Sequence, residues 1–128
     1  MNDLDTDKSK RETRLNLPIN KAYIHIACMT ADAISKELKL NTKKSEEIKA
    51  AVFDAYFFII NNEKIFDEKT FLLEFIEKNE SISINFGIKA KSPDFILSSG
   101  KHSDPPLPFE ASFSDSNSFL KLSGRLAI

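Results

Sequence analysis

The chain of 128 residues has no tryptophan, one cysteine and three glycines, and its formal net charge is only -1. A single cysteine cannot form a disulfide within the chain and is typical of a reducing compartment, so we expect a cytoplasmic protein. No apolar run reaches the length of a membrane span, and the N-terminal residues lack the apolar core of a secretion signal. The small net charge gives no electrostatic case for nucleic acid or for an anionic membrane surface as a partner.

The composition is that of an ordinary globular protein, with 41% hydrophobic and 29% charged residues. A chain of this length has room for one domain with a single core. We therefore predict a flexible, polar N-terminal tail over residues 1–12 and one domain over residues 13–128. Eleven phenylalanines are enough to fill that core, and they do not by themselves name a function.

The longest helical pattern runs from Thr42 to Asn62, TKKSEEIKAAVFDAYFFIINN. One apolar stripe has i, i+4, i+7 and i+11 spacing, and a second set of apolar residues widens it, so we expect both faces to be covered. The two sets are Ile48, Val52, Ala55 and Ile59, and Phe53, Tyr56, Phe57 and Ile60. The only charge from Ala50 to Ile60 is Asp54. Because an unpaired buried carboxylate is costly, Asp54 either points into a wetted cleft or has a partner, or it lies on the exposed edge of the helix.

The remaining pattern predicts three strands, over residues 13–19, 70–78 and 81–90, and a second helix over residues 20–40. It also predicts a long loop over residues 92–118 and a short terminal helix over residues 119–128. The loop is rich in serine and proline and resembles a lid. The fold class that follows is α+β, a two-layer sandwich with a small, mainly antiparallel sheet and helices on one face. Helix 20–40 is apolar over more than one stripe and a small sheet has exposed edges, so we expect a homodimer through residues 15–34.

Residues 70–78 fit two patterns. Phe71, Leu73 and Phe75 alternate as in a strand, whereas Leu72, Phe75 and Ile76 fit a helix. The strictly alternating run over residues 81–89 follows after a short polar turn, and this favours a strand and an antiparallel hairpin.

No metal site is predicted. His25 and Cys28 lie three residues apart on the helix 20–40, but no further cysteine or histidine completes a ligand set, so Cys28 is interpreted as a small buried hydrophobe. Lysines gather near the junction of the two helices, at positions 36, 39, 43, 44 and 49, but acids interrupt them. A solvated charged face is therefore expected there.

The stretch from Leu17, LPINKAYIHIACMTADAISKELKLNTKKSEEIKAAVFDAYFFIIN, resembles the N-terminal half of the anti-sigma-factor serine kinases. These proteins use the Bergerat ATP-binding fold, which histidine kinases and gyrase share. The most specific part of the resemblance is IKAAVFDA after an acidic helix start, and the whole resemblance covers roughly residues 15–91. It implies a histidine-kinase-ATPase-like fold, ATP and magnesium as cofactors, and a sigma factor or an antagonist protein as partner.

The chain departs from the family's pattern at the site itself. The family's central helix carries an acid that serves as general base and, four positions later, an asparagine that binds magnesium. Asp54 falls on the acid, but Phe58 falls on the asparagine and offers no lone pair to a metal. The adenine-binding Asp-x-Gly-x-Gly turn falls on Ala90, Lys91 and Ser92, which contain no acid. Three glycines cannot build two phosphate-binding turns, and we expect the chain to end before the family's final two strands, truncated at the C-terminus.

The resemblance with these departures predicts a degenerate member and leaves three functions open. The first is a noncatalytic regulatory module that binds a sigma factor or an antagonist protein in a partner-switching system and needs no cofactor. The second is an active serine/threonine kinase that binds ATP and magnesium, with Asp54 as the catalytic base. The third is a small-ligand sensor whose phenylalanine-rich former nucleotide pocket holds an apolar molecule.

Overall fold

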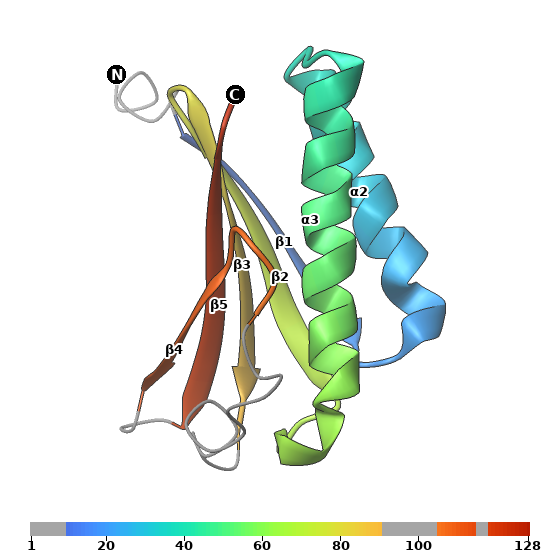
Figure 1. The fold of residues 1–128 in the computed structure, drawn as a ribbon, viewed down its shortest axis with the longest axis vertical. Helices are drawn as coiled ribbons and strands as arrows, with labels where there is room; N and C mark the ends of the chain where they lie inside the picture. The colour runs from blue at the N-terminus through green and yellow to red at the C-terminus, as the bar shows by residue number, and fades with distance from the viewer. Residues whose placement is uncertain (1–9, 91–104, 115–117) are drawn as a thin grey trace, which may run out of the picture.

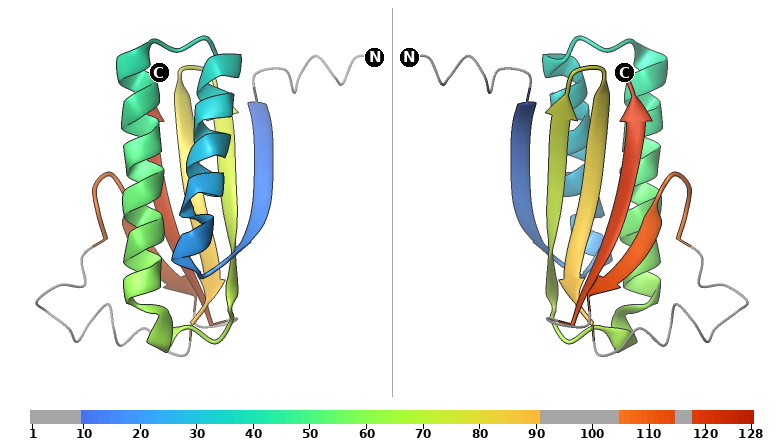
Figure 2. Two further views of the ribbon diagram at one scale, coloured as in Figure 1. Left: turned by 90° about the vertical axis from the view of Figure 1, so that its right-hand side faces the viewer. Right: turned by 90° about the vertical axis from the view of Figure 1, so that its left-hand side faces the viewer.

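The computed structural model describes residues 10–90, 105–114 and 118–128. Five antiparallel strands form one sheet in the order β1-β2-β3-β5-β4, and two helices lie side by side on one face of it (Figures 1 and 2). The elements are β1 (Lys10–Pro18), α2 (Ile24–Glu37), α3 (Thr42–Asn61), β2 (Thr70–Lys78), β3 (Ser81–Lys89), β4 (Glu110–Ser114) and β5 (Phe119–Ala127), with short 3-10 turns over Lys21–Tyr23 and Glu63–Ile65. The predicted two-layer α+β architecture with helices on one face is confirmed.

Asparagine caps begin the 3-10 turn before α2 and begin α3. The side chain of Asn20 accepts a hydrogen bond from the backbone N–H of Ala22, and that of Asn41 accepts one from Lys44 at 2.8 Å. These bonds satisfy N–H groups that a helix start leaves without partners. The predicted helix 20–40 is therefore a 3-10 turn followed by α2, and α3 begins at the predicted residue.

The hairpin is confirmed, because residues 70–78 form strand β2 and pair with β3. The alternating residues Phe71, Leu73 and Phe75 are buried, as the strand pattern predicted. The turn between the strands places Asn79 at a φ of 55°, a left-handed conformation that asparagine tolerates better than most residues. Packing against the helices thus selects the strand reading over the helical one.

The C-terminal prediction is wrong, because residues 119–127 form strand β5 instead of a helix. β5 pairs with β3 along its whole length, and Leu120 and Leu122 are almost fully buried at alternate positions. The next inward position is Gly124, where an added Cβ would come within 2.9 Å of the ring of Phe109. Pairing with β3 decides the conformation here, because the helical spacing came from only a few apolar residues.

The predicted long loop also needs correction. Residues 110–114, inside the predicted loop 92–118, form strand β4, which pairs with β5 at the edge of the sheet. The sheet therefore has five strands instead of the predicted three. The truncation before the family's final two strands stays a prediction. Strand β1 begins at Lys10, inside the predicted tail. Residues 1–9, 91–104 and 115–117 lie outside the described part of the chain.

The core lies between α3 and the sheet. Five residues of α3 are fully buried there: Ile48, Val52, Ala55, Tyr56 and Ile59. Tyr56 packs edge to face on Phe71, with ring centroids 4.8 Å apart, and its hydroxyl donates to the carbonyl oxygen of Pro18. Small residues at the helix contact, Ala27 and Ala31 of α2, let the two helices approach closely.

Candidate functional site

The predicted catalytic base, Asp54, is exposed on α3. Among the described residues no ion pair and no side-chain hydrogen bond involves its carboxylate. The structure therefore favours the reading in which Asp54 lies on the exposed edge of the helix. This exposed position gives no support to the assignment of Asp54 as a general base.

The predicted nucleotide-binding positions are filled by apolar groups. Phe58 lies one helical turn after Asp54 and is half-buried against the core. Ala90, at the end of β3, is fully buried, forms an isolated bridge with Phe66, and donates its N–H to the carbonyl oxygen of Ser118 at 2.9 Å. Lys91 and Ser92 lie outside the described residues. The positions that the resemblance assigns to metal and adenine therefore carry an aromatic ring and a methyl group.

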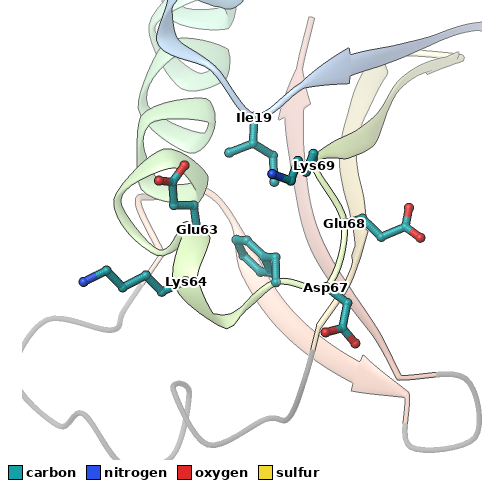
Figure 3. A pocket seen from close by; sticks show the side chains of 7 residues that line it. Ile19, Glu63, Lys64, Asp67, Glu68 and Lys69 are labelled. Atoms are coloured by element: carbon teal, nitrogen blue, oxygen red, sulfur yellow. The ribbon is translucent and has the colours of Figure 1, made fainter.

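A cavity of about 550 Å³ lies below the C-terminal end of α3 (Figure 3). It is lined by Ile19, Glu63, Lys64, Phe66, Asp67, Glu68 and Lys69. Figure 3 shows the carboxylates of Glu63, Asp67 and Glu68 directed to three different sides. Because these acids do not converge, they form neither a shared-proton pair nor a ligand set, and in the described part of the chain no three metal-binding side chains cluster.

The outer surface of the helix pair is the strongest candidate site. Phe53 and Phe57 of α3 stack on each other with ring centroids 6.1 Å apart and planes 10° apart, and they remain 45% and 42% exposed. The prediction that both rings are covered is wrong. We call this surface the aromatic patch, and it comprises these two rings with a shallow hollow of about 460 Å³ lined by Lys21, Ile24, His25, Cys28, Phe53 and Phe57.

Cys28 lines the aromatic patch. Its thiol is half-buried and lies 4.0 Å from the carbonyl oxygen of Lys49. Burial raises the pKa of the Cys28 thiol, an effect that the positive charge of Lys49 partly offsets. A thiol with a raised pKa is a poor nucleophile at neutral pH. His25 beside it is exposed, and among the described residues no third metal-binding side chain joins the two. The interpretation of Cys28 as a packing residue fits, although it is less buried than expected.

Three of the five lysines around the helix junction are paired with acids, as expected for a solvated face. Lys36 lies 3.1 Å from Asp32, Lys44 lies 3.0 Å from Glu47, and Lys49 reaches Asp32 at 3.9 Å. The hydrogen bond from Lys36 is the main cause that lowers the pKa of Asp32. This network ties α2 to α3 and forms no basic surface for an anionic ligand.

The face of the sheet opposite the helices carries a polar row whose members bond to one another. Arg14 of β1 pairs with Glu74 of β2 at 3.0 Å, and Ser123 of β5 donates a hydrogen bond to Asn85 of β3 at 2.6 Å. These residues form one row across the sheet. The polar groups of this row satisfy one another, whereas the rings of the aromatic patch stay partly exposed.

The apolar pattern of the sequence does not reveal the aromatic patch. It predicts a helix that is covered on two faces, and Phe53 and Phe57 belong to that pattern. The predicted sheet was the available signal, because only one face of α3 can pack on a sheet. Since α2 covers only part of the opposite face of α3, some apolar residues there stay exposed. Among the described residues no helix is long and apolar enough to cross a membrane. No known family model and no curated protein sequence matches the chain.

Proposed function

We propose that this chain is a noncatalytic interaction domain that binds a sigma factor or an antagonist protein in a partner-switching system. The observation that carries the proposal is the stacked, exposed pair Phe53 and Phe57 on the outer surface of the helices. The class of partner comes from the resemblance of residues 15–91 to anti-sigma-factor kinases, and a Bergerat-like origin of the fold belongs to the same proposal. Two helices on one face of an antiparallel sheet are compatible with it.

A noncatalytic role is supported by the residues at the expected site. Phosphoryl transfer depends on positioning and on charge stabilisation by a metal and by phosphate-binding groups. Asp54 is exposed, Phe58 packs against the core, and Ala90 is buried. Each missing polar anchor removes a contact of about 1–3 kcal/mol, so the described groups give a nucleotide little to bind.

A protein partner is supported by the kind of surface that the helices expose. Aromatic side chains are enriched in interface cores, and a few of them carry most of the binding energy. The aromatic patch offers two rings beside a hollow, with Lys21 and His25 on its rim. This combination suits an apolar segment of a partner that is flanked by acidic residues.

The test is direct binding to the sigma factors and antagonist proteins encoded in the source genome, measured by calorimetry with purified proteins. We expect at least one of them to bind wild type, and Phe53→Ser and Phe57→Ser each to weaken that binding about tenfold or more. Met29→Ser, which removes an exposed apolar side chain from a different surface, is the matched control and leaves the affinity unchanged. If none of these proteins binds, or if the phenylalanine variants bind like wild type, the proposal is wrong.

A further inference from the structure

An unpaired strand edge and an apolar helix stripe meet at one margin of the molecule, formed by β1 and α2. We infer that the chain is a homodimer in which β1 pairs antiparallel with β1 of a second copy and α2 packs beside the α2 of that copy. This interface goes beyond the proposed function, because it uses a surface distinct from the aromatic patch.

The strand edge is long and regular. β1 has nine residues and stands at the end of the strand order, and among the described residues only β2 pairs with it. Figure 2 shows β1 at the outer margin of the sheet, next to α2. Such an edge presents a row of backbone N–H and C=O groups to which another strand can bind. Pairing with a second copy would join two five-stranded sheets into one.

The stripe on α2 lies beside this edge. Ile26, Met29, Ala33 and Ile34 line a hollow of about 450 Å³ together with Thr13 of β1. Met29 is 64% exposed, the largest exposed fraction among the large apolar residues of the helices. Ala33 is small, which lets a second helix approach closely at this point. Ile26 and Ile34 pack partly against the core, whereas Met29 and Ala33 are exposed, so a partner on β1 would cover the exposed part of the stripe.

The charges along β1 favour a second copy of β1 as the occupant. When two antiparallel copies of β1 are related by a two-fold axis, one residue lies on the axis and faces the same residue of the other copy. With Thr13 on the axis, Glu12 of each copy faces Arg14 of the other. With Arg14 or Glu12 on the axis, like charges face each other, which disfavours those registers.

The register on Thr13 also extends a charge row that exists within one copy. Arg14 already contacts Glu74 at 3.0 Å and Glu12 at 3.2 Å. Glu12 of the second copy would add a carboxylate on the outer side of this guanidinium. The charges of β1 are therefore complementary to those of a second, antiparallel β1. A strand that carried charges of only one sign would repel its copy.

The opposite edge of the sheet provides an internal control. β4 is shorter, with five residues, and its outward residues Glu110, Ser112 and Ser114 are exposed and polar. Short, polar edges of this kind resist pairing.

A disulfide tests the register. In a Cys28→Ser background, Thr13→Cys places two thiols on the two-fold axis, where Cβ atoms of paired residues lie about 4.5–5.5 Å apart, close to disulfide reach. Mild oxidation should convert most of this variant into a linked dimer on a non-reducing gel. Cys28→Ser with Ser112→Cys, on the opposite edge, should remain unlinked. Equal cross-linking of the two variants, or no cross-linking of a folded Thr13→Cys variant, would overturn the inference.

Light scattering tests the interface itself without a covalent bond. We expect wild type to have twice the monomer mass at high micromolar concentration. Met29→Glu should raise the dimer dissociation constant about tenfold or more, whereas Phe53→Glu, in the aromatic patch, should leave it unchanged. A wild-type monomer, or a dimer insensitive to Met29→Glu, contradicts the inference. Neither result bears on binding through Phe53 and Phe57, so the two proposals fail separately.

Discussion

The two flanks of α3 carry aromatic rings in opposite environments. Tyr56 is fully buried, packs edge to face on Phe71, and donates a hydrogen bond to Pro18. Phe53 and Phe57, three residues before it and one after it, stack on each other and remain almost half exposed. One helix therefore uses the same residue class for two purposes, to hold the fold together and to form an outer surface.

The difference shows which rings stabilise the folded chain. Burial of apolar area contributes about 25 cal/mol per Å², so a fully buried ring contributes far more than a ring that stays half in water. Phe53 and Phe57 forgo much of that stabilisation. An exposed aromatic pair that the fold does not need is the kind of surface that a partner covers.

The sharpest test of this comparison is a matched pair of truncations on α3. Tyr56→Ala should lower the free energy of unfolding by about 3–5 kcal/mol, because it leaves a cavity beside Phe71 and removes the hydrogen bond to the carbonyl oxygen of Pro18. Phe53→Ala should lower it by less than about 1 kcal/mol, because the ring is largely exposed. Urea denaturation monitored by circular dichroism measures both. Equal losses would show that the two flanks do not differ in the way described.

Alkaline pH should act on the buried flank of α3 through Tyr56. Burial raises the pKa of Tyr56 from 10.0 to about 12, so folding favours the neutral phenol. The contribution of Tyr56 is fully present below pH 10, the unfolded pKa, and is lost as the pH rises towards about 12. At about 1.4 kcal/mol for each pKa unit, the loss approaches 3 kcal/mol. Stability measured across this range should fall less in Tyr56→Phe than in wild type, and parallel curves would count against the assignment.

Phe58 is half-buried, so its burial lies between that of Tyr56 and that of Phe53 and Phe57. Phe58→Asn should destabilise the fold by about 1–2 kcal/mol, because the ring loses its packing and an amide enters an apolar contact. It should not create nucleotide binding, because Ala90 stays in place of the acid. Thermal melts with and without ATP and magnesium measure both effects. A melting temperature that rises with ATP and magnesium in the variant alone would contradict this.

The smallest expected effect is on the rate at which the Cys28 thiol is alkylated. Since burial raises the pKa of the Cys28 thiol, iodoacetamide at neutral pH should modify native protein several-fold more slowly than urea-unfolded protein. Lys49→Ala should slow the native reaction further, because it removes the charge that lowers this pKa. Native labelling as fast as unfolded labelling would show that Cys28 is a reactive thiol.

Sequence patterns predicted the parts of the fold with strong local periods. The helix from Thr42 and the hairpin over residues 70–89 appear in the structure with nearly the predicted bounds. Strand β5 was missed because its apolar residues are few and fit two periods, and only its pairing with β3 decides between them. Strand β4 was missed because its five residues include only Ala111 and Phe113 as apolar members.

The candidate site was harder to predict than the fold. Periodicity shows that Phe53, Tyr56 and Phe57 are apolar, but it cannot show which of them the sheet covers. That depends on the tertiary position of α2, which lies against only part of α3. The departures at Phe58 and Ala90 could be read from the sequence, because they depend on residue type alone. Whether the chain has lost nucleotide binding stays a prediction.

Calorimetric titration of the wild-type chain with ATP and magnesium tests the noncatalytic interpretation most directly. Without a metal-binding asparagine at position 58 and an acid at position 90, affinity should fall by several factors of ten relative to a site that has both, since about 1.4 kcal/mol corresponds to each factor of ten. We predict no saturable heat at micromolar nucleotide. Binding of ATP with magnesium in the micromolar range would contradict the interpretation and would restore Asp54 as a candidate catalytic base.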